Sequence, residues 1–158
     1  MSDSAQRLVD VLREAGRTIS TAESCTAGGL AYEITRIPGA SACFVGGVVA
    51  YANVVKTTLL RVPESTLARY GAVSAEAAEA MATSCRELFA TDIAVSITGI
   101  AGPGGGTPEK PVGLVFIAVA GETGVVGRRF DFPGSRAEVR GQAIAAALAT
   151  ADAFLADG

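Results

Sequence analysis

The sequence contains no histidine, and this absence removes several familiar kinds of catalytic site. A Ser-His-Asp triad, an HExxH zinc site and an imidazole general base all require that residue. The cysteines, Cys25, Cys43 and Cys85, are odd in number and scattered, which argues against a disulfide framework and a zinc ribbon. Any hydrolytic chemistry must therefore take its base from a lysine, a carboxylate, a tyrosine or a thiol.

Other scarcities bound the class of protein. Tryptophan is absent and aromatic residues make up 6%, so the core must be built from aliphatic side chains, within a chain that is 49% hydrophobic. The net charge is -3 and no block of lysine or arginine occurs, which argues against nucleic acid as a partner. No apolar run approaches about 18 residues and no signal peptide is evident. We expect one cytoplasmic domain over residues 1–158, away from membranes, and the high apolar fraction favours a homodimer.

Residues 21–29 (TAESCTAGG) concentrate the polar chemistry of the chain. A β-prone piece precedes them at 17–20, and apolar residues at helical spacing follow from Leu30, which predicts strand, tight turn and helix. Ser24 and Thr26 should then lie at or just before the first helical turn. Unpaired N–H groups there suit an oxyanion or a phosphate, and a hydroxyl there could act as a nucleophile. The alternative is plain N-capping by Ser24 or Thr26.

The remaining pattern predicts the fold class. Asp3 and Gln6 have the spacing of a capping box, and an apolar run ending at Tyr51 is typical of a strand covered on both faces. Order and spacing favour an α/β fold: a three-layer α/β/α domain with a mixed, mainly parallel sheet and an antiparallel hairpin. We expect further helices over 4–15, 74–89 and 135–155, and strands over 44–51, 93–98, 113–120 and 125–132.

Three further features are candidate binding elements. Lys56, the only lysine in the first 100 residues, follows Tyr51 and Asn53. A glycine-rich loop over 99–108 follows a strand, where open α/β sheets bind ligands. Arg136 and Arg140 lie one turn apart at the start of the last helix, where the helix dipole disfavours cations unless an anion balances them. The alternatives are a solvated lysine, a plain connector and surface arginines.

Six short motifs, in this order, resemble the CinA C-terminal domain family over nearly the whole chain. They are residues 22–26 (AESCT), 51–56 (YANVVK), 71–74 (GAVS), 98–103 (TGIAGP), 110–113 (KPVG) and 134–136 (GSR). Members occur alone or behind a larger N-terminal domain, and we expect this chain to be of the stand-alone kind. The sequence departs from the usual pattern at Ala27, Val54 and Ser135, where glycine, an acidic residue and aspartate are common.

The resemblance implies nicotinamide-nucleotide amidase activity, with nicotinamide mononucleotide as a small-molecule substrate and no cofactor or metal. It also implies a Ser-Lys dyad, Ser24 and Lys56, assisted by Tyr51. Lys56 can act as a base only if burial lowers its pKa. We expect an oxyanion hole from backbone amides of that turn and a phosphate site from an arginine and the glycine loop. The predicted substrate-binding positions are Glu23, Thr26, Ala27, Asn53, Thr98, Gly99, Gly102, Arg136 and Arg140, with the amides of Thr26 and Ala27 forming the oxyanion hole.

Two alternatives stay open. Cys25 could be the nucleophile, since a helix N-terminus favours a thiolate. A different class of function would be a nucleotide-binding or competence-related interaction domain without turnover. An intact Ser24, Tyr51 and Lys56 counts against this second alternative, because a pure binder needs no buried lysine.

Overall fold

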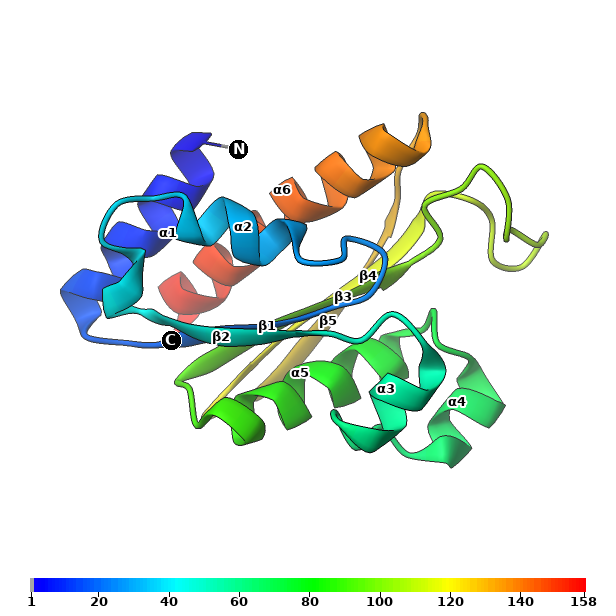
Figure 1. Ribbon diagram of the computed structural model, residues 1–158, viewed down its shortest axis with the longest axis horizontal. Helices are drawn as coiled ribbons and strands as arrows, with labels where there is room; N and C mark the ends of the chain where they lie inside the picture. Colours follow the sequence, from blue (N-terminus) through cyan, green and yellow to red (C-terminus); the bar gives the residue numbers. More distant parts are fainter. Residues whose placement is uncertain (1) are drawn as a thin grey trace.

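A computed structural model describes residues 2–158 and places a five-stranded sheet between two layers of helices (Figure 1). Helices α1, α2 and α6 cover one face of the sheet, and α3, α4 and α5 cover the other. The three-layer α/β/α expectation is confirmed. The elements are α1 (Ser2–Ala15), β1 (Ile19–Glu23), α2 (Gly29–Thr35), a short 3-10 turn (Ala40–Ala42), β2 (Phe44–Val49), α3 (Asn53–Thr58), α4 (Glu64–Tyr70), α5 (Ala75–Phe89), β3 (Ile93–Gly99), β4 (Leu114–Gly121), β5 (Gly124–Asp131) and α6 (Arg136–Asp157).

The strand order is β2-β1-β3-β4-β5, which confirms a mixed sheet with an antiparallel hairpin. Strands β2, β1 and β3 are parallel, so that Ala22 of β1 pairs with Val48 on one side and Ser96 on the other. Strand β4 is antiparallel to β3 and forms the hairpin with β5. The carboxyl ends of three adjacent parallel strands therefore meet at one edge of the sheet, with β1 in the middle.

The core is aliphatic on both faces, as the composition predicts. Between the sheet and the layer of α1, α2 and α6, the buried side chains include Leu8, Leu12, Leu30, Ile34 and Ile117. Gly29 lets α2 approach α6, because a Cβ there would lie 2.6 Å from Cδ1 of Ile144. Within residues 2–158, no helix is long and apolar enough to cross a membrane.

Three local expectations differ from the structure. Strand β1 begins at Ile19 and continues through Glu23, so the polar residues at 21–23 lie within a buried strand. Strand β2 lies at the edge of the sheet with alternate exposure, and Val45 and Val49 are about half exposed, so it is not covered on both faces. Helices α3 and α4 occupy a stretch for which we predicted no helix.

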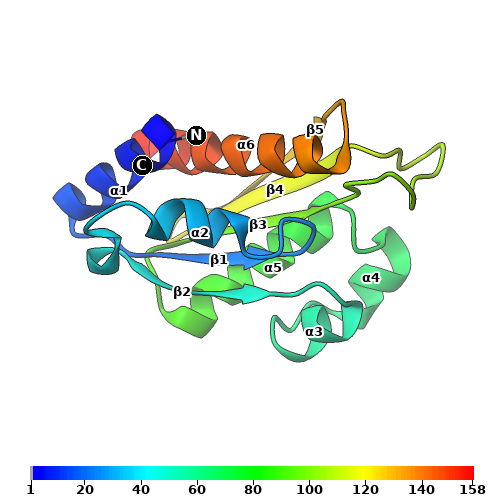
Figure 2. The ribbon, with the colours of Figure 1, turned by 45° about the horizontal axis from the view of Figure 1, so that its top comes forward.

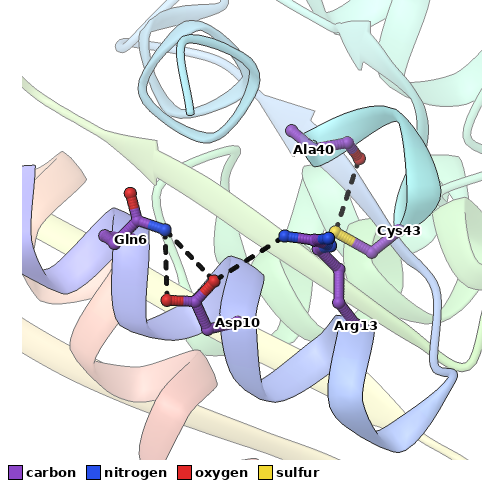
Figure 3. Close-up of polar contacts among 5 residues, drawn as sticks. All are labelled: Gln6, Asp10, Arg13, Ala40 and Cys43. Carbon is purple, nitrogen blue, oxygen red and sulfur yellow. Dashed lines mark hydrogen bonds and ion pairs between the residues drawn. The ribbon is translucent and has the colours of Figure 1, made fainter. Parts of the chain in front are cut away.

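Helix α1 supports the turn that leads into β2 (Figure 3). The expected capping box at Asp3 is wrong, because α1 begins at Ser2 and the Gln6 amide donates to the Asp10 carboxylate at 3.1 Å. Arg13 pairs with Asp10 at 3.9 Å and its guanidinium lies under Gly39. In the same turn, the Cys43 thiol donates to the carbonyl of Ala40 at 3.4 Å. These contacts fix the entry into the edge strand that leads to the candidate site.

Candidate active site

The candidate site lies where the three parallel strands end. Ser24 directly follows β1, Tyr51 follows β2, and Gly99 is the last residue of β3, while Lys56 comes from α3 just beyond β2. Together they line a cavity of about 220 Å³. Its wall consists of Ser24, Cys25, Tyr51, Asn53, Lys56, Ala72, Val73, Thr98, Gly99, Ala101 and Arg136. Several predicted positions distant in sequence are thus brought together.

Lys56 is the most unusual residue of the site, because its side chain is 1% exposed. Its ammonium nitrogen donates to Oγ of Ser24 at 3.0 Å and to the carbonyls of Ala50 at 2.7 Å and Tyr51 at 3.1 Å. Across residues 2–158 no carboxylate forms an ion pair with it. Burial lowers the pKa of Lys56, since neutral acceptors replace water without supplying an opposite charge.

Glu23 holds the turn that carries Ser24. The Glu23 side chain is 1% exposed, and its carboxylate accepts hydrogen bonds from Thr26 Oγ1 at 2.7 Å and from the amides of Leu30 at 2.8 Å and Ala31 at 3.1 Å. Its negative charge lies against the positive end of α2. All three donors belong to the protein, and Glu23 is not among the residues that line the cavity. Glu23 therefore supports the turn, and its predicted contact with substrate stays a prediction.

The capping interpretation of the serine and threonine is wrong. Helix α2 begins at Gly29, and its N-cap is Gly28, with φ of 95° and no side-chain cap. Ser24 lies five residues before the helix, and Thr26 uses its hydroxyl on Glu23. The Ser24 hydroxyl consequently has Lys56 as its partner rather than the end of a helix.

The backbone amides of the turn divide into engaged and free groups. The Ser24 N–H donates to the carbonyl of Ile97 at 2.9 Å, and the Ala27 N–H donates to the carbonyl of Ser24 at 3.1 Å. The expected oxyanion donor at Ala27 is therefore already engaged. Among the described residues, the N–H groups of Cys25 and Thr26 donate to no other backbone group. Ala27 has φ of 47°, in the left-handed region that favours glycine.

The two arginines occupy different places. Arg136, the first residue of α6, lines the cavity and donates to the carbonyl of Gly102 at 2.9 Å and to the phenol oxygen of Tyr51 at 3.3 Å. Arg140 lies behind the turn, where it donates to the carbonyl of Thr26 at 3.2 Å. Its buried Nε has no hydrogen-bond partner within residues 2–158. Only Arg136 is placed to meet a ligand in the cavity.

The remaining predicted positions fall on the cavity wall or its rim. Asn53 begins α3 with an exposed side chain, and Gly99 ends β3. Thr98 lines the cavity, although its hydroxyl donates to the carbonyl of Ala72 at 2.8 Å. Gly102 contributes its carbonyl to Arg136.

Sequence reasoning missed two kinds of contributor. Ala72 and Val73 line the cavity, and residues 71–74 were a motif whose role we did not assign. The carbonyl of Ala50, which holds Lys56, carries no signal in the sequence because any residue can supply it.

Cys25 follows Ser24 and is 6% exposed. Burial raises the pKa of the Cys25 thiol to about 11 and outweighs the opposing effects of its backbone hydrogen bond and of Arg140. A thiol with such a pKa is protonated at neutral pH and is a weak nucleophile. Among the residues that the structure describes, no group of three potential metal ligands comes together.

Comparison with known proteins identifies a matching family model and close sequence relatives. The model of the CinA C-terminal domain matches residues 1–155. A CinA-like protein of Geotalea uraniireducens is 53% identical over 133 residues, which are 84% of this chain and 32% of that protein. A CinA-like protein of Mycolicibacterium vanbaalenii is 53% identical over 135 residues, 85% of this chain and 32% of the relative. The chain thus spans about a third of the length of these curated relatives.

Solved structures show the same fold over nearly the whole chain. A competence/damage inducible protein from Agrobacterium tumefaciens is 39% identical with a TM-score of 0.94, covering 96% of this chain and 93% of that one. A CinA superfamily protein from Klebsiella pneumoniae is 33% identical with a TM-score of 0.96, covering 99% and 98% of the two chains.

Proposed function

This chain belongs to the CinA C-terminal domain family, and on that premise we propose that it hydrolyses the carboxamide of nicotinamide mononucleotide. The products are nicotinate mononucleotide and ammonia. One observation supports this most: a lysine that is 1% exposed lies 3.0 Å from a serine hydroxyl, with only neutral acceptors around it. Such surroundings lower the pKa of a lysine and favour its neutral form. The neutral amine can then act as the base for the neighbouring serine.

The two carbonyls on Lys56 determine which proton it can take. A neutral amine has two N–H bonds, and the carbonyls of Ala50 and Tyr51 accept both. Its lone pair is then left for Ser24 Oγ, and Lys56 removes the hydroxyl proton as Oγ bonds to the carboxamide carbon. As the C–N bond breaks, Lys56 gives this proton to the leaving nitrogen, which departs as ammonia.

The second half of the reaction uses the same groups. Water gives a proton to Lys56, its oxygen bonds to the acyl carbon, and the bond to Ser24 Oγ breaks as Oγ regains the proton. The oxyanion that forms in each half needs a preorganised donor. The Thr26 amide is the predicted donor that remains free of the protein's own acceptors, whereas Ala27 is engaged.

The phosphate belongs with Arg136 in this account. A cavity of about 220 Å³ is smaller than the ~300–1,000 Å³ of typical ligand pockets, so we place the pyridine ring and its carboxamide inside and the ribose phosphate at the rim. Arg136 borders that rim and has no carboxylate partner among the described residues. Its charge is thus available to a phosphate monoester. A homodimer and a cytoplasmic location stay predictions.

The alternatives make different demands. A Cys25 nucleophile needs a thiolate, which a pKa of about 11 disfavours. Binding without turnover does not require a buried lysine that is hydrogen-bonded to a serine hydroxyl.

Ammonia release from nicotinamide mononucleotide tests the proposal, with wild type, Ser24→Ala and Cys25→Ala assayed side by side. We expect release by wild type and Cys25→Ala and none by Ser24→Ala. Loss in Cys25→Ala alone would make the cysteine the nucleophile. Absence of release by folded wild type, with retained binding of the mononucleotide, would favour the binding domain.

A further inference from the structure

Two motifs whose role we did not assign, residues 71–74 (GAVS) and 110–113 (KPVG), meet in the structure. The Lys110 ammonium donates to the carbonyl of Tyr70, the last residue of α4. A Cβ at the next residue, Gly71, would lie 2.8 Å from Nζ of Lys110. Glycine at this position, with φ of 78°, therefore leaves room for the contact.

The contact reaches one wall of the candidate site. Ala72 and Val73, which directly follow it in sequence, line the cavity. The Thr98 hydroxyl, from β3, fixes this wall from one direction by donating to the carbonyl of Ala72 at 2.8 Å. Lys110 holds the preceding carbonyl, that of Tyr70, from another direction.

Lys110 belongs to the loop between β3 and β4, residues 100–113, which projects beyond the sheet at the same end as α3 and α4 (Figure 2). At its base the amide of Ile100 donates to the carbonyl of Leu114 at 2.9 Å, and the amide of Gly113 donates to that of Ile100 at 2.8 Å. Within residues 2–158, the bond from Lys110 to Tyr70 is the only hydrogen bond that joins residues 103–110 to the chain outside the loop. The loop is thus fixed at its base and held near its tip by a single side chain.

The same loop carries part of the opposite side of the cavity. Ala101 lines the cavity, and the carbonyl of Gly102 accepts from Arg136 at 2.9 Å. Across the described residues Lys110 forms no ion pair with a carboxylate, so its ammonium is committed to the carbonyl at the end of α4. Such terminal carbonyls lack donors within their own helix.

We propose that Lys110 is a positioning residue, whose hydrogen bond to Tyr70 holds the loop against the wall at Ala72 and Val73 and keeps the cavity at the width that the pyridine ring fits. This inference rests on the proposed function. If the ring binds only when the loop is held, the apparent dissociation constant is the intrinsic constant divided by the fraction of molecules in that form. Loss of the bond should therefore weaken binding and leave the turnover of bound substrate unchanged.

The variant Lys110→Met tests this role, because it keeps an unbranched side chain and removes the N–H donors. We expect KM to rise about tenfold for nicotinamide mononucleotide and by the same factor for nicotinamide riboside, since both contain the ring. The kcat of each should stay within about twofold of wild type. Lys110→Arg, which keeps a cationic donor, should restore KM to within about threefold. Arg69→Met is the matched control, because it removes an exposed cation from the last turn of α4 and leaves the bond to Tyr70 in place.

Three other results would overturn the inference. Unchanged KM in folded Lys110→Met would leave the bond with a structural role alone. A fall in kcat at constant KM would mean that the bond acts on Ser24 and Lys56. A loss for the mononucleotide without a loss for the riboside would place Lys110 at the phosphate.

Calorimetry in the Ser24→Ala background measures the affinity for nicotinamide mononucleotide without turnover. We expect Ser24→Ala/Lys110→Met to bind about tenfold more weakly than Ser24→Ala. Equal affinity, or no binding by Ser24→Ala, would overturn the inference whether or not the protein is an amidase. Weaker binding of this size, with no ammonia release by wild type, would instead contradict only the proposed reaction.

Discussion

The two ends of the parallel strands treat charge in opposite ways. At the amino end, the Asp92 carboxylate accepts from the Thr18 amide at 2.7 Å and the Thr18 hydroxyl at 3.0 Å. The backbone hydrogen bond, more than any other contact, holds the pKa of Asp92 below its usual value. At the carboxyl end, Lys56 is surrounded by neutral oxygens, and burial lowers its pKa. The surroundings of Asp92 stabilise its charged form, whereas those of Lys56 destabilise its charged form.

The difference separates a structural charge from a reactive one. Asp92 joins the start of β3 to the residue before β1, and its environment favours the state that it already has in water. The surroundings of Lys56 disfavour the protonated ammonium, which is the form that a lysine has in water at neutral pH. A lysine in such surroundings can act as a base near neutral pH. At the carboxyl end, the lysine whose pKa is shifted toward the neutral form lies 3.0 Å from the hydroxyl of Ser24.

The largest contrast should come from the dyad itself. Ser24→Ala and Lys56→Ala should each lower kcat by about 10³-fold or more, because members of one catalytic unit lose nearly everything singly. The double variant should be little worse than either, whereas multiplied losses would show that the two residues act independently. Asp92→Ala, at the opposite end of the sheet, should keep kcat within about twofold of wild type. Kinetic constants and thermal unfolding should be measured on wild type and on all four variants.

The two arginines sharpen the comparison within the carboxyl end. Arg136→Ala should lower kcat/KM for the mononucleotide about ten- to a hundredfold and affect the riboside little, because a charge-assisted contact contributes about 1.5–3 kcal/mol. Arg140→Ala should affect both substrates alike, since Arg140 contacts the turn at Thr26 rather than the cavity. Equal losses on both substrates for Arg136→Ala would mean that it supports the fold instead of the phosphate.

Asp92 provides a smaller effect on stability. Its folded pKa is depressed, so its contribution is present above the unfolded pKa of about 3.9 and is lost as the pH falls through the folded pKa. Because the side chain is exposed, we expect Asp92→Asn to lower the free energy of unfolding by only about 0.5–1 kcal/mol at pH 7. Urea unfolding of wild type and Asp92→Asn should show a smaller difference in the free energy of unfolding at pH 3 than at pH 7. An equal difference at both pH values would mean that the charge of Asp92 contributes nothing to stability.

The smallest effect is expected at Cys25. Cys25→Ala should change kcat by less than about threefold, because a protonated thiol takes no part in the attack. With a thiol pKa of about 11 and 6% exposure, alkylation by iodoacetamide at pH 8 should be much slower than that of a free cysteine. Rapid alkylation accompanied by inactivation would point back to the cysteine as nucleophile.

Sequence patterns predicted the layers of this fold better than its details. The long helices and the hairpin followed from periodicity. In the structure, a capping box formed by Ser135 and Glu138 fixes the start of α6. Strand β2 was misread because an unbroken apolar run is typical of a covered strand, and only the strand order shows that it lies at the edge. The start of α2 was placed too early because the buried Glu23 carboxylate, not Ser24 or Thr26, accepts from its first amides.

For the candidate site, the sequence predicted which residues take part but not which of their atoms are in contact. Motifs supplied Ser24, Tyr51 and Lys56 as candidates, but their proximity depends on β1 and β2 being neighbours with aligned carboxyl ends. No sequence pattern reveals that the Tyr51 carbonyl, and not its phenol, meets Lys56. Backbone groups carry no residue signature, so contacts of this kind emerge only from the three-dimensional arrangement.

The pH dependence of kcat/KM for nicotinamide mononucleotide tests the central claim most directly. With no histidine in the chain, Lys56 is the base in this account, and it must be neutral to accept the Ser24 proton. The rate should rise with pH through neutral and mildly alkaline values, with an apparent pKa well below the roughly 10.4 of a free lysine. The direction agrees with the effect of burial on Lys56. A rate that is independent of pH across that range, in protein shown to stay folded, would contradict the assignment of Lys56 as the base.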